Sequence, residues 1–142
     1  GEGGNDTLRG LTGNDSIDGG LGNDTIVTGG GVDTVSFTTA LSTSLNRDTI
    51  TDFYVPADVM RLDDLIFTTV ARTSVTNSVL LAGQFWKSAT GVAHDADDRI
   101  IYNTVTGVLT YDSNGNAAGG TIAQFAVLTP NLALTNADFL VI

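Results

Sequence analysis

The chain has no cysteine, and its 142 residues include only two prolines, six basic residues and one histidine. Without cysteine no disulfide can stabilise the fold, so a secreted chain of this kind needs a substitute, and a bound metal is the obvious one. No run of about 18 apolar residues is present, which excludes a hydrophobic membrane-spanning helix. No N-terminal signal peptide is visible, and we expect the chain to be the tail of a longer protein.

Basic residues are outnumbered by 16 acidic ones, which gives a formal net charge of −10. A surface of this sign repels phosphate groups, which argues against nucleic acid and anionic membranes as partners. The same charge suits cations. Two divalent ions would change the formal net charge from −10 to −6.

Glycine is abundant instead, and it follows a pattern: four consecutive nine-residue units occupy residues 1–36. The sixth place of each unit is an aspartate, and the eighth place is apolar. The aspartates are Asp6, Asp15, Asp24 and Asp33, and the apolar residues are Leu8, Ile17, Ile26 and Val35. Glu2, Leu11 and Thr28 stand where other units have glycine, and the fourth unit is the most degenerate.

The first six residues of each unit predict a turn, because glycine, asparagine and aspartate tolerate the backbone angles that turns require. The last three suit one brief strand whose middle side chain points inward. Two units then make one coil of 18 residues, with successive coils about 4.8 Å apart. Asp6 should therefore stack on Asp24, and Asp15 on Asp33, while the apolar eighth places fill a thin core.

Stacked carboxylates repel one another unless a cation lies between them. Carboxylate and backbone carbonyl oxygens are the ligands that calcium prefers, and glycine turns leave their carbonyls accessible. The alternative is a flexible Gly/Asn/Asp linker. Four units in phase, each with an apolar eighth residue, argue against that alternative.

On these residues the chain resembles the RTX family of calcium-binding nonapeptide repeats. The resemblance implies one calcium site with Asp6 and Asp24 and a second with Asp15 and Asp33. It also implies turn carbonyls as ligands, although the sequence does not fix which carbonyls each turn contributes. The implied carbonyls are those of Gly1, Gly3, Gly20 and Gly22 in the first site, and of Gly10, Thr12, Gly29 and Gly31 in the second.

Residues 37–142 contain less glycine and more β-branched and aromatic residues. Strands are predicted at 48–55, 58–63 and 121–128, and a hairpin at 99–103 and 107–111. For residues 79–87 a short helix is preferred over a buried turn. The predicted fold is all-β, with a short parallel β-roll over residues 1–36 packed end-on against a β-rich C-terminal cap over residues 37–142.

The cap also resembles RTX exoproteins, in the segments 48–53, 58–63, 97–102, 109–112 and 138–142. The last segment, Asp138 followed by four apolar residues, resembles the uncleaved C-terminal signal of type I (ABC) secretion. The resemblance implies a secreted bacterial protein, extracellular or on the cell surface. An ordinary final strand that fills the core is the alternative, and the two interpretations are compatible.

Several other residues are weaker candidates for a site. Asp112, Asn114 and Asn116 resemble the start of a calcium loop, but the twelfth place is Ala123 instead of glutamate. The nearby Asp95, Asp97 and Asp98 would complete such a site only if the fold brings them close. Asp48, Asp52 and Asp58 are interpreted as caps of strands and turns, and His94 as a surface-loop residue. Trp86, Phe85 and Tyr54 could form a sugar-binding platform, but packing in the core is the preferred interpretation.

The sequence supports two hypotheses about function. The first is a calcium-gated folding and secretion module at the C-terminus of an RTX protein. The second is a calcium-loaded module that binds polysaccharide or acts as an adhesin, although the outward places of the repeats offer few aromatic contacts. An enzyme is not expected, because no nucleophile, base and orienting group can be assembled from these residues.

Overall fold

The computed structural model describes residues 1–42, 44–71 and 78–142, and almost all regular structure in these ranges is β-strand. The strands are β1 (Thr7–Arg9), β2 (Ser16–Asp18), β3 (Thr25–Val27), β4 (Thr34–Phe37), β5 (Asp48–Ile50), β6 (Val59–Leu62), β7 (Ser78–Val79), β8 (Phe85–Ser88), β9 (Ile100–Asn103), β10 (Val108–Asp112), β11 (Ile122–Val127) and β12 (Phe139–Val141). Two 3₁₀ helices, η1 (Ala82–Gln84) and η2 (Asn136–Asp138), are the described helical segments. The all-β prediction is confirmed.

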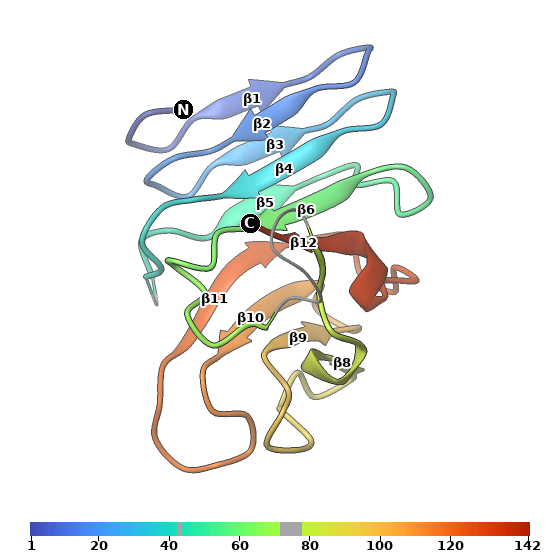
Figure 1. Cartoon of the computed structure of the whole chain (residues 1–142). Helices are drawn as coiled ribbons and strands as arrows, with labels where there is room; N and C mark the ends of the chain where they lie inside the picture. Colours follow the sequence, from blue (N-terminus) through green and yellow to red (C-terminus); the bar gives the residue numbers. More distant parts are fainter. Residues whose placement is uncertain (43, 72–77) are drawn as a thin grey trace.

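The four repeat units form a β-roll in which successive strands alternate between two sheets (Figure 1). Strand β1 pairs with β3, and β2 with β4, both in parallel. Leu8 lies opposite Ile26, and Ile17 opposite Val35, which is the predicted register of one coil per 18 residues. The spacing of the repeats therefore determines the pairing of their strands.

Both sheets continue past residue 36 without a break in pairing. Strand β5 pairs with β3, and β6 pairs with β4, again in parallel. The sheet that begins with β1 has the order β1-β3-β5-β11-β10-β9-β8, and the other has the order β2-β4-β6-β12-β7. The division at residue 36 stays a prediction, but the segments on its two sides share both sheets.

The C-terminal strands complete the two sheets from the far end of the chain. Strand β11 lies beside β5, and β12 lies beside β6 (Figure 1). On its other side, β12 pairs with β7. The predicted hairpin is confirmed as β9 and β10, with Leu109 opposite Tyr102. The last residues of the chain therefore form an interior strand of the second sheet.

Two sequence predictions differ from the structure. The helix preferred over 79–87 is wrong: a single 3₁₀ turn leads into β8, and Phe85 lies opposite Ile100 in a parallel pair with β9. Aromatic residues suit such a half-buried sheet surface, and this pairing prevails over the local preference. The strand predicted at 48–55 ends at Ile50, because Tyr54 begins a turn that is closed by the amides of Ala57 and Asp58.

A continuous apolar core runs between the two sheets. Ile26 stacks on Ile50 in one sheet, and Val35, Met60 and Phe139 stack in the other. All five are almost fully buried, and each such side chain contributes about 1.5–3 kcal/mol of transfer free energy. In the described part of the chain, no helix is long and apolar enough to cross a membrane.

Candidate metal centre

The aspartates of the repeats form two columns, one along each edge of the roll. Asp24 Oδ1 accepts a hydrogen bond from the amide of Asp6 at 2.7 Å, and Asp33 Oδ1 accepts one from the amide of Asp15 at 2.8 Å. Each bond holds a carboxylate between two stacked turns. The structure therefore brings together the two pairs that the sequence predicts as metal ligands.

The second oxygen of these carboxylates is the notable feature of the columns. Oδ2 of Asp15, Asp24 and Asp33 is buried and has no hydrogen-bond partner among the described residues. Asp24 is only 1% exposed and Asp33 is fully buried. A buried carboxylate oxygen without a donor is costly, and a cation bound to it removes that cost. These three atoms therefore fit a metal site.

The turn carbonyls divide into two sets. The carbonyls of Glu2 and Leu21 accept hydrogen bonds from the facing turn along one edge, and those of Leu11 and Gly30 do so along the other. Among the described residues, the eight carbonyls predicted as ligands accept none of these turn-to-turn bonds. Gly20 O does accept the hydroxyl of Thr39, at 2.8 Å. Backbone amides thus bond to one set of carbonyls, and the carbonyls of the other set remain accessible to an ion.

The first residue of a unit faces the aspartate column, and a side chain at this place would collide with the column. This explains the glycine at Gly1 and Gly10. A Cβ at Gly1 would collide with Asp6 Oδ2 and with the carbonyl of Gly19. A Cβ at Gly10 would collide with the carbonyl of Thr28 and approach Asp15 Oδ2 within 2.8 Å. Without a side chain at these places, carboxylate and carbonyl oxygens converge from two coils. This oxygen set matches the ligands of calcium.

Sequence reasoning missed that both columns continue beyond the repeats. Asp48 Oδ1 accepts the amide of Asp24 at 3.0 Å, and Asp58 Oδ1 accepts the amide of Asp33 at 3.1 Å. Both residues were interpreted as caps, and these hydrogen bonds do cap the last repeat turns. Each also occupies the next level of an aspartate column. The separations of 24 and 25 residues hide this relation, because the earlier levels are 18 apart.

The pKa of Asp48 lies above its ordinary value. Burial, together with the negative charges of Asp24 and Asp18, raises the pKa of Asp48 to about 6, and the hydrogen bond from the Asp24 amide opposes this rise. Three carboxylates therefore lie close enough to repel one another at this level.

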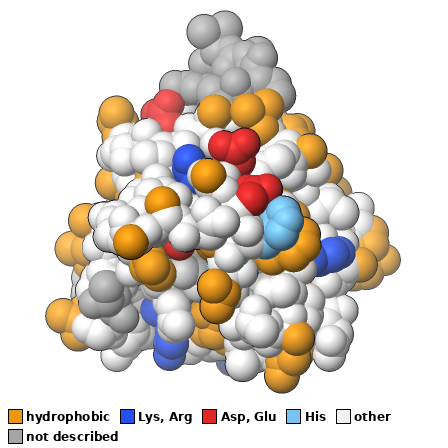
Figure 2. Space-filling view, turned by 90° about the horizontal axis from the view of Figure 1, so that it is seen from below, with side chains coloured by type: hydrophobic (Ala, Val, Ile, Leu, Met, Phe, Trp, Pro, Cys, Tyr) orange, Lys and Arg blue, Asp and Glu red, His pale blue; other side chains and the backbone are white. Residues whose placement is uncertain are grey.

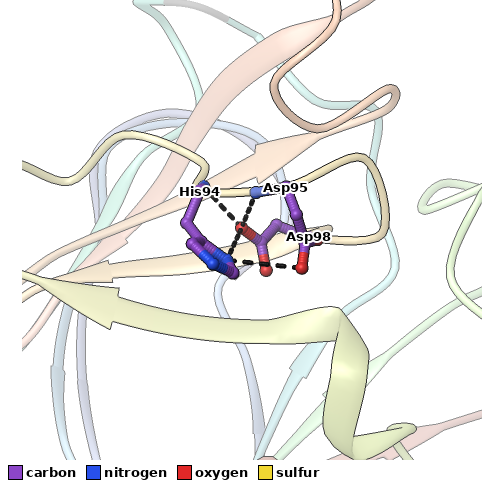
Figure 3. Close-up of side chains that lie close together, drawn as sticks. All are labelled: His94, Asp95 and Asp98. Carbon is purple, nitrogen blue, oxygen red and sulfur yellow. Dashed lines mark hydrogen bonds and ion pairs between the residues drawn. The ribbon is translucent and has the colours of Figure 1, made fainter.

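A second group of metal-ligating side chains lies at the other end of the molecule, where the single histidine is at the surface beside acidic residues (Figure 2). His94 Nδ1 lies 3.3 Å from Asp95 Oδ2 and 3.8 Å from Asp98 Oδ2 (Figure 3). Asp98 Oδ2 already accepts the amides of His94 and Asp95, at 2.6 and 3.0 Å. The His94 ring also stacks on Trp86, with 4.4 Å between the ring centroids. These contacts show that the three side chains close an exposed loop, which explains why they lie together.

The loop after β10 does pack against this cluster, as an additional calcium site would require. The contacts, however, are hydrogen bonds from Asn116, whose amide donates to Asp95 O at 2.9 Å and whose side chain donates to His94 O at 3.0 Å. The Asn114 side chain donates to the carbonyls of Ala117 and Ala118. Asp112 Oδ1 accepts the amide of Asn114. These hydrogen bonds stabilise the turn after β10.

The aromatic residues considered as a sugar platform have different neighbours. Phe85 packs on Phe139 with 5.3 Å between ring centroids, while Trp86 stacks on His94. Tyr54 lies in the turn before β6 and is 60% exposed. Phe85 and Trp86 thus serve the packing of the cap.

A parallel β-roll with buried, unpartnered carboxylates between glycine-rich turns defines a calcium-binding repeat. Comparison with protein families agrees: residues 1–35 match the RTX calcium-binding nonapeptide repeat, in four copies. The amino-terminal quarter of the chain therefore consists of RTX repeats, and the remaining residues lie outside the match. A search of curated proteins found no match to the chain.

Proposed function

We propose that this chain is a calcium-dependent folding and secretion module of an extracellular RTX protein, with a structural rather than catalytic role. The observation that carries the proposal is the set of buried carboxylate oxygens without donors at Asp15, Asp24 and Asp33. An ion between stacked turns would bind these oxygens together with turn carbonyls. The two sites are Asp6 with Asp24 and Asp15 with Asp33, in the ligand sets that the sequence predicts.

Calcium binding of this kind is coupled to folding. The ligands of each site come from two coils, so the site exists only when the coils are stacked, and binding free energy becomes folding free energy. Extracellular calcium modules have affinities of roughly 10⁻⁴–10⁻³ M, so they load outside the cell and stay empty where calcium is scarce. The repeats would then remain unfolded until export.

The C-terminal segment is a final strand that fills the core, and this position is compatible with a signal that is read earlier, in the unfolded chain. Phe139 and Val141 are fully buried, and β12 is paired on both sides, with β6 and β7. An exporter could read residues 138–142 only before β12 enters the sheet. Slow folding in low calcium would keep this segment accessible, and calcium outside the cell would then allow the strand to dock.

Circular dichroism and thermal melting of the chain, first in chelator and then in calcium, test the folding part of the proposal. We expect calcium to raise the melting temperature and the β-sheet signal, and magnesium to do so much less, because it dehydrates reluctantly and demands stricter geometry. The double variant Asp24→Asn/Asp33→Asn should lose most of this response. Asp97→Asn, which removes one exposed charge, should retain it. An unchanged melting curve on calcium addition would refute the proposal.

Export by a type I secretion system tests the remaining part. The chain should appear in the medium of cells that express an exporter of this class, and Phe139→Asp should reduce export strongly. Leu140→Ala, at a half-buried position of the same strand, should reduce it less. Equal export of all three chains, or export of none, would argue against a signal in residues 138–142.

A further inference from the structure

A small cavity lies between the two sheets where the repeats meet the following loop. Its volume is about 10 Å³, which leaves room for a single sphere of the size of a water molecule or a small ion. Asp18 and Ser36 line it from β2 and β4, and Asp48 lines it from β5. The apolar side chains of Phe37, Leu41 and Phe125 also line it.

One polar atom of the lining has no partner. Ser36 is 3% exposed, and its hydroxyl makes no hydrogen bond among the described residues. A buried hydroxyl normally has a partner, so this atom indicates something bound in the cavity. The hydroxyl oxygen can serve as a neutral ligand of a hard cation.

The charge around the cavity has one sign on its polar side. Three carboxylates lie close together there: Asp18 and Asp48 line the cavity, and Asp24 is a charged neighbour of Asp48. A Cβ at Gly19 would lie 2.5 Å from Asp24 Oδ2 and 2.8 Å from Asp48 Oδ2, so both oxygens converge on the place that glycine leaves open. Water alone would not remove the repulsion between these groups. A divalent cation would.

The carboxylates of the lining are already held in position. Asp18 accepts the amide of Gly20 at 2.9 Å through Oδ1 and the hydroxyl of Thr38 at 2.6 Å through Oδ2. Asp48 uses Oδ1 for the amide of Asp24. Each oxygen retains a lone pair, and these bonds fix both carboxylates without neutralising them. A fixed set of oxygens needs little reorganisation when an ion binds.

The equivalent level on the other edge is different. Asp58 Oδ2 accepts the Thr28 hydroxyl at 3.2 Å and the Tyr54 amide at 2.9 Å. Asp52 accepts the amides of Thr28 and Gly29, at 2.7 and 3.0 Å. Protein donors thus satisfy the carboxylates of Asp52 and Asp58. On the other edge, by contrast, the Ser36 hydroxyl and Asp48 Oδ2 are not used in this way and can bind an ion. This contrast favours one extra site and places it on the edge of Asp48.

We propose a third calcium site in this cavity, with ligands from Asp18, Ser36 and Asp48. It lies at the junction of the repeats and the cap, and it uses Asp48, which is outside the matched repeat segment. An ion here would connect β2 and β4 of one sheet to β5 of the other. It rests on the proposed function in that it assumes the chain is loaded with calcium.

Calcium stoichiometry of the full chain, by equilibrium dialysis and elemental analysis, tests this site. We expect Asp48→Asn to bind one ion fewer per chain than the wild type, because Asn keeps the acceptor for the Asp24 amide but removes the charge. Ser36→Ala, which keeps every charge, should raise the Kd of one ion by about tenfold. Asp97→Asn should bind as the wild type does.

Wild type and Asp48→Asn with the same number of ions would overturn the third site and leave the two repeat sites standing. A wild type that binds no calcium would overturn both proposals. Should Asp48→Asn fail to fold, anomalous scattering from calcium-grown crystals of the wild type decides the question. A calcium peak between Asp18 and Asp48 supports the site, and a water molecule alone at that position refutes it.

Discussion

Neighbouring turns are held together differently in the repeats and in the loops that follow them. In the repeats, Asp15, Asp24 and Asp33 each present a buried oxygen with no protein donor. In the loop of residues 51–58, hydroxyl and amide groups donate to Asp52 and Asp58. The same residue type thus stacks the coils in both regions, but protein donors satisfy its oxygens in the second region, whereas our proposal assigns that role to a metal in the first. Dependence on calcium should therefore decrease along the roll.

Removal of calcium should give the largest effect, and it should separate the two regions. At a calcium concentration one hundred times the Kd, each site contributes about 2.7 kcal/mol of stability, which chelator abolishes. Hydrogen exchange measured with and without calcium should show lost protection for β1–β4. The β9–β10 hairpin should keep most of its protection. Uniform loss across all strands would mean that the two regions unfold as one unit.

Asp58→Ala should have the next largest effect, and it should not depend on calcium. The substitution leaves the amides of Asp33 and Tyr54 without their acceptor, while the hydroxyl of Thr28 keeps Asp52 Oδ1 as an acceptor at 3.1 Å. Loss of these bonds in a buried place should cost about 3 kcal/mol. Urea denaturation in calcium and in chelator should give the same loss. A loss seen only in calcium would instead identify Asp58 as a metal ligand.

Asp24→Asn should change stability in opposite directions under the two conditions. The asparagine oxygen still accepts the Asp6 amide, but the unpartnered charge is gone. In chelator the variant should be more stable than the wild type by about 1 kcal/mol, because a buried charge without a partner is removed. In calcium it should be less stable. Melting curves of Asp97→Asn provide the control for charge alone, and the same sign in both buffers would contradict the two-column interpretation.

The smallest effect should be the pH dependence of the calcium-free chain. Because burial and neighbouring carboxylates raise the pKa of Asp48 to about 6, the folded state binds this proton more tightly than the unfolded state. The contribution of Asp48 is therefore fully present below its ordinary pKa and is lost as pH rises through 6. In chelator, the melting temperature of the wild type should rise between pH 7.5 and 5.5. Asp48→Asn should flatten this slope, and an equal slope in both proteins would exclude Asp48 as its source.

Some features of the fold followed from local patterns alone. The nine-residue period fixes the turns, the short strands and the pairs Asp6/Asp24 and Asp15/Asp33, because residues one coil apart must stack. The hairpin of β9 and β10 followed in the same way, since only a short turn separates two alternating segments. In both cases the partners lie close in sequence, so composition and spacing carry the information.

Other features depended on partners far away in the chain. Residues 79–87 were expected to be a helix, but Trp86 lies opposite Ile101 in a parallel pair that no local pattern encodes. Strand β12 reaches β6 from about eighty residues away, and Phe139 completes the stack begun by Val35. Burial between two sheets decides these pairings, and burial is a property of the assembled fold.

The sequence by itself determined the roll, its two aspartate columns through residue 33, and the class of ion that suits them, because a strict period turns sequence distance into spatial distance. Only the tertiary structure decided that Asp48 and Asp58 extend those columns, since inserted residues in the loops break the period. It also decided that donors surround Asp58 while Ser36 and Asp48 retain unused oxygens. Which buried carboxylates need a cation depends on what the rest of the chain places around them.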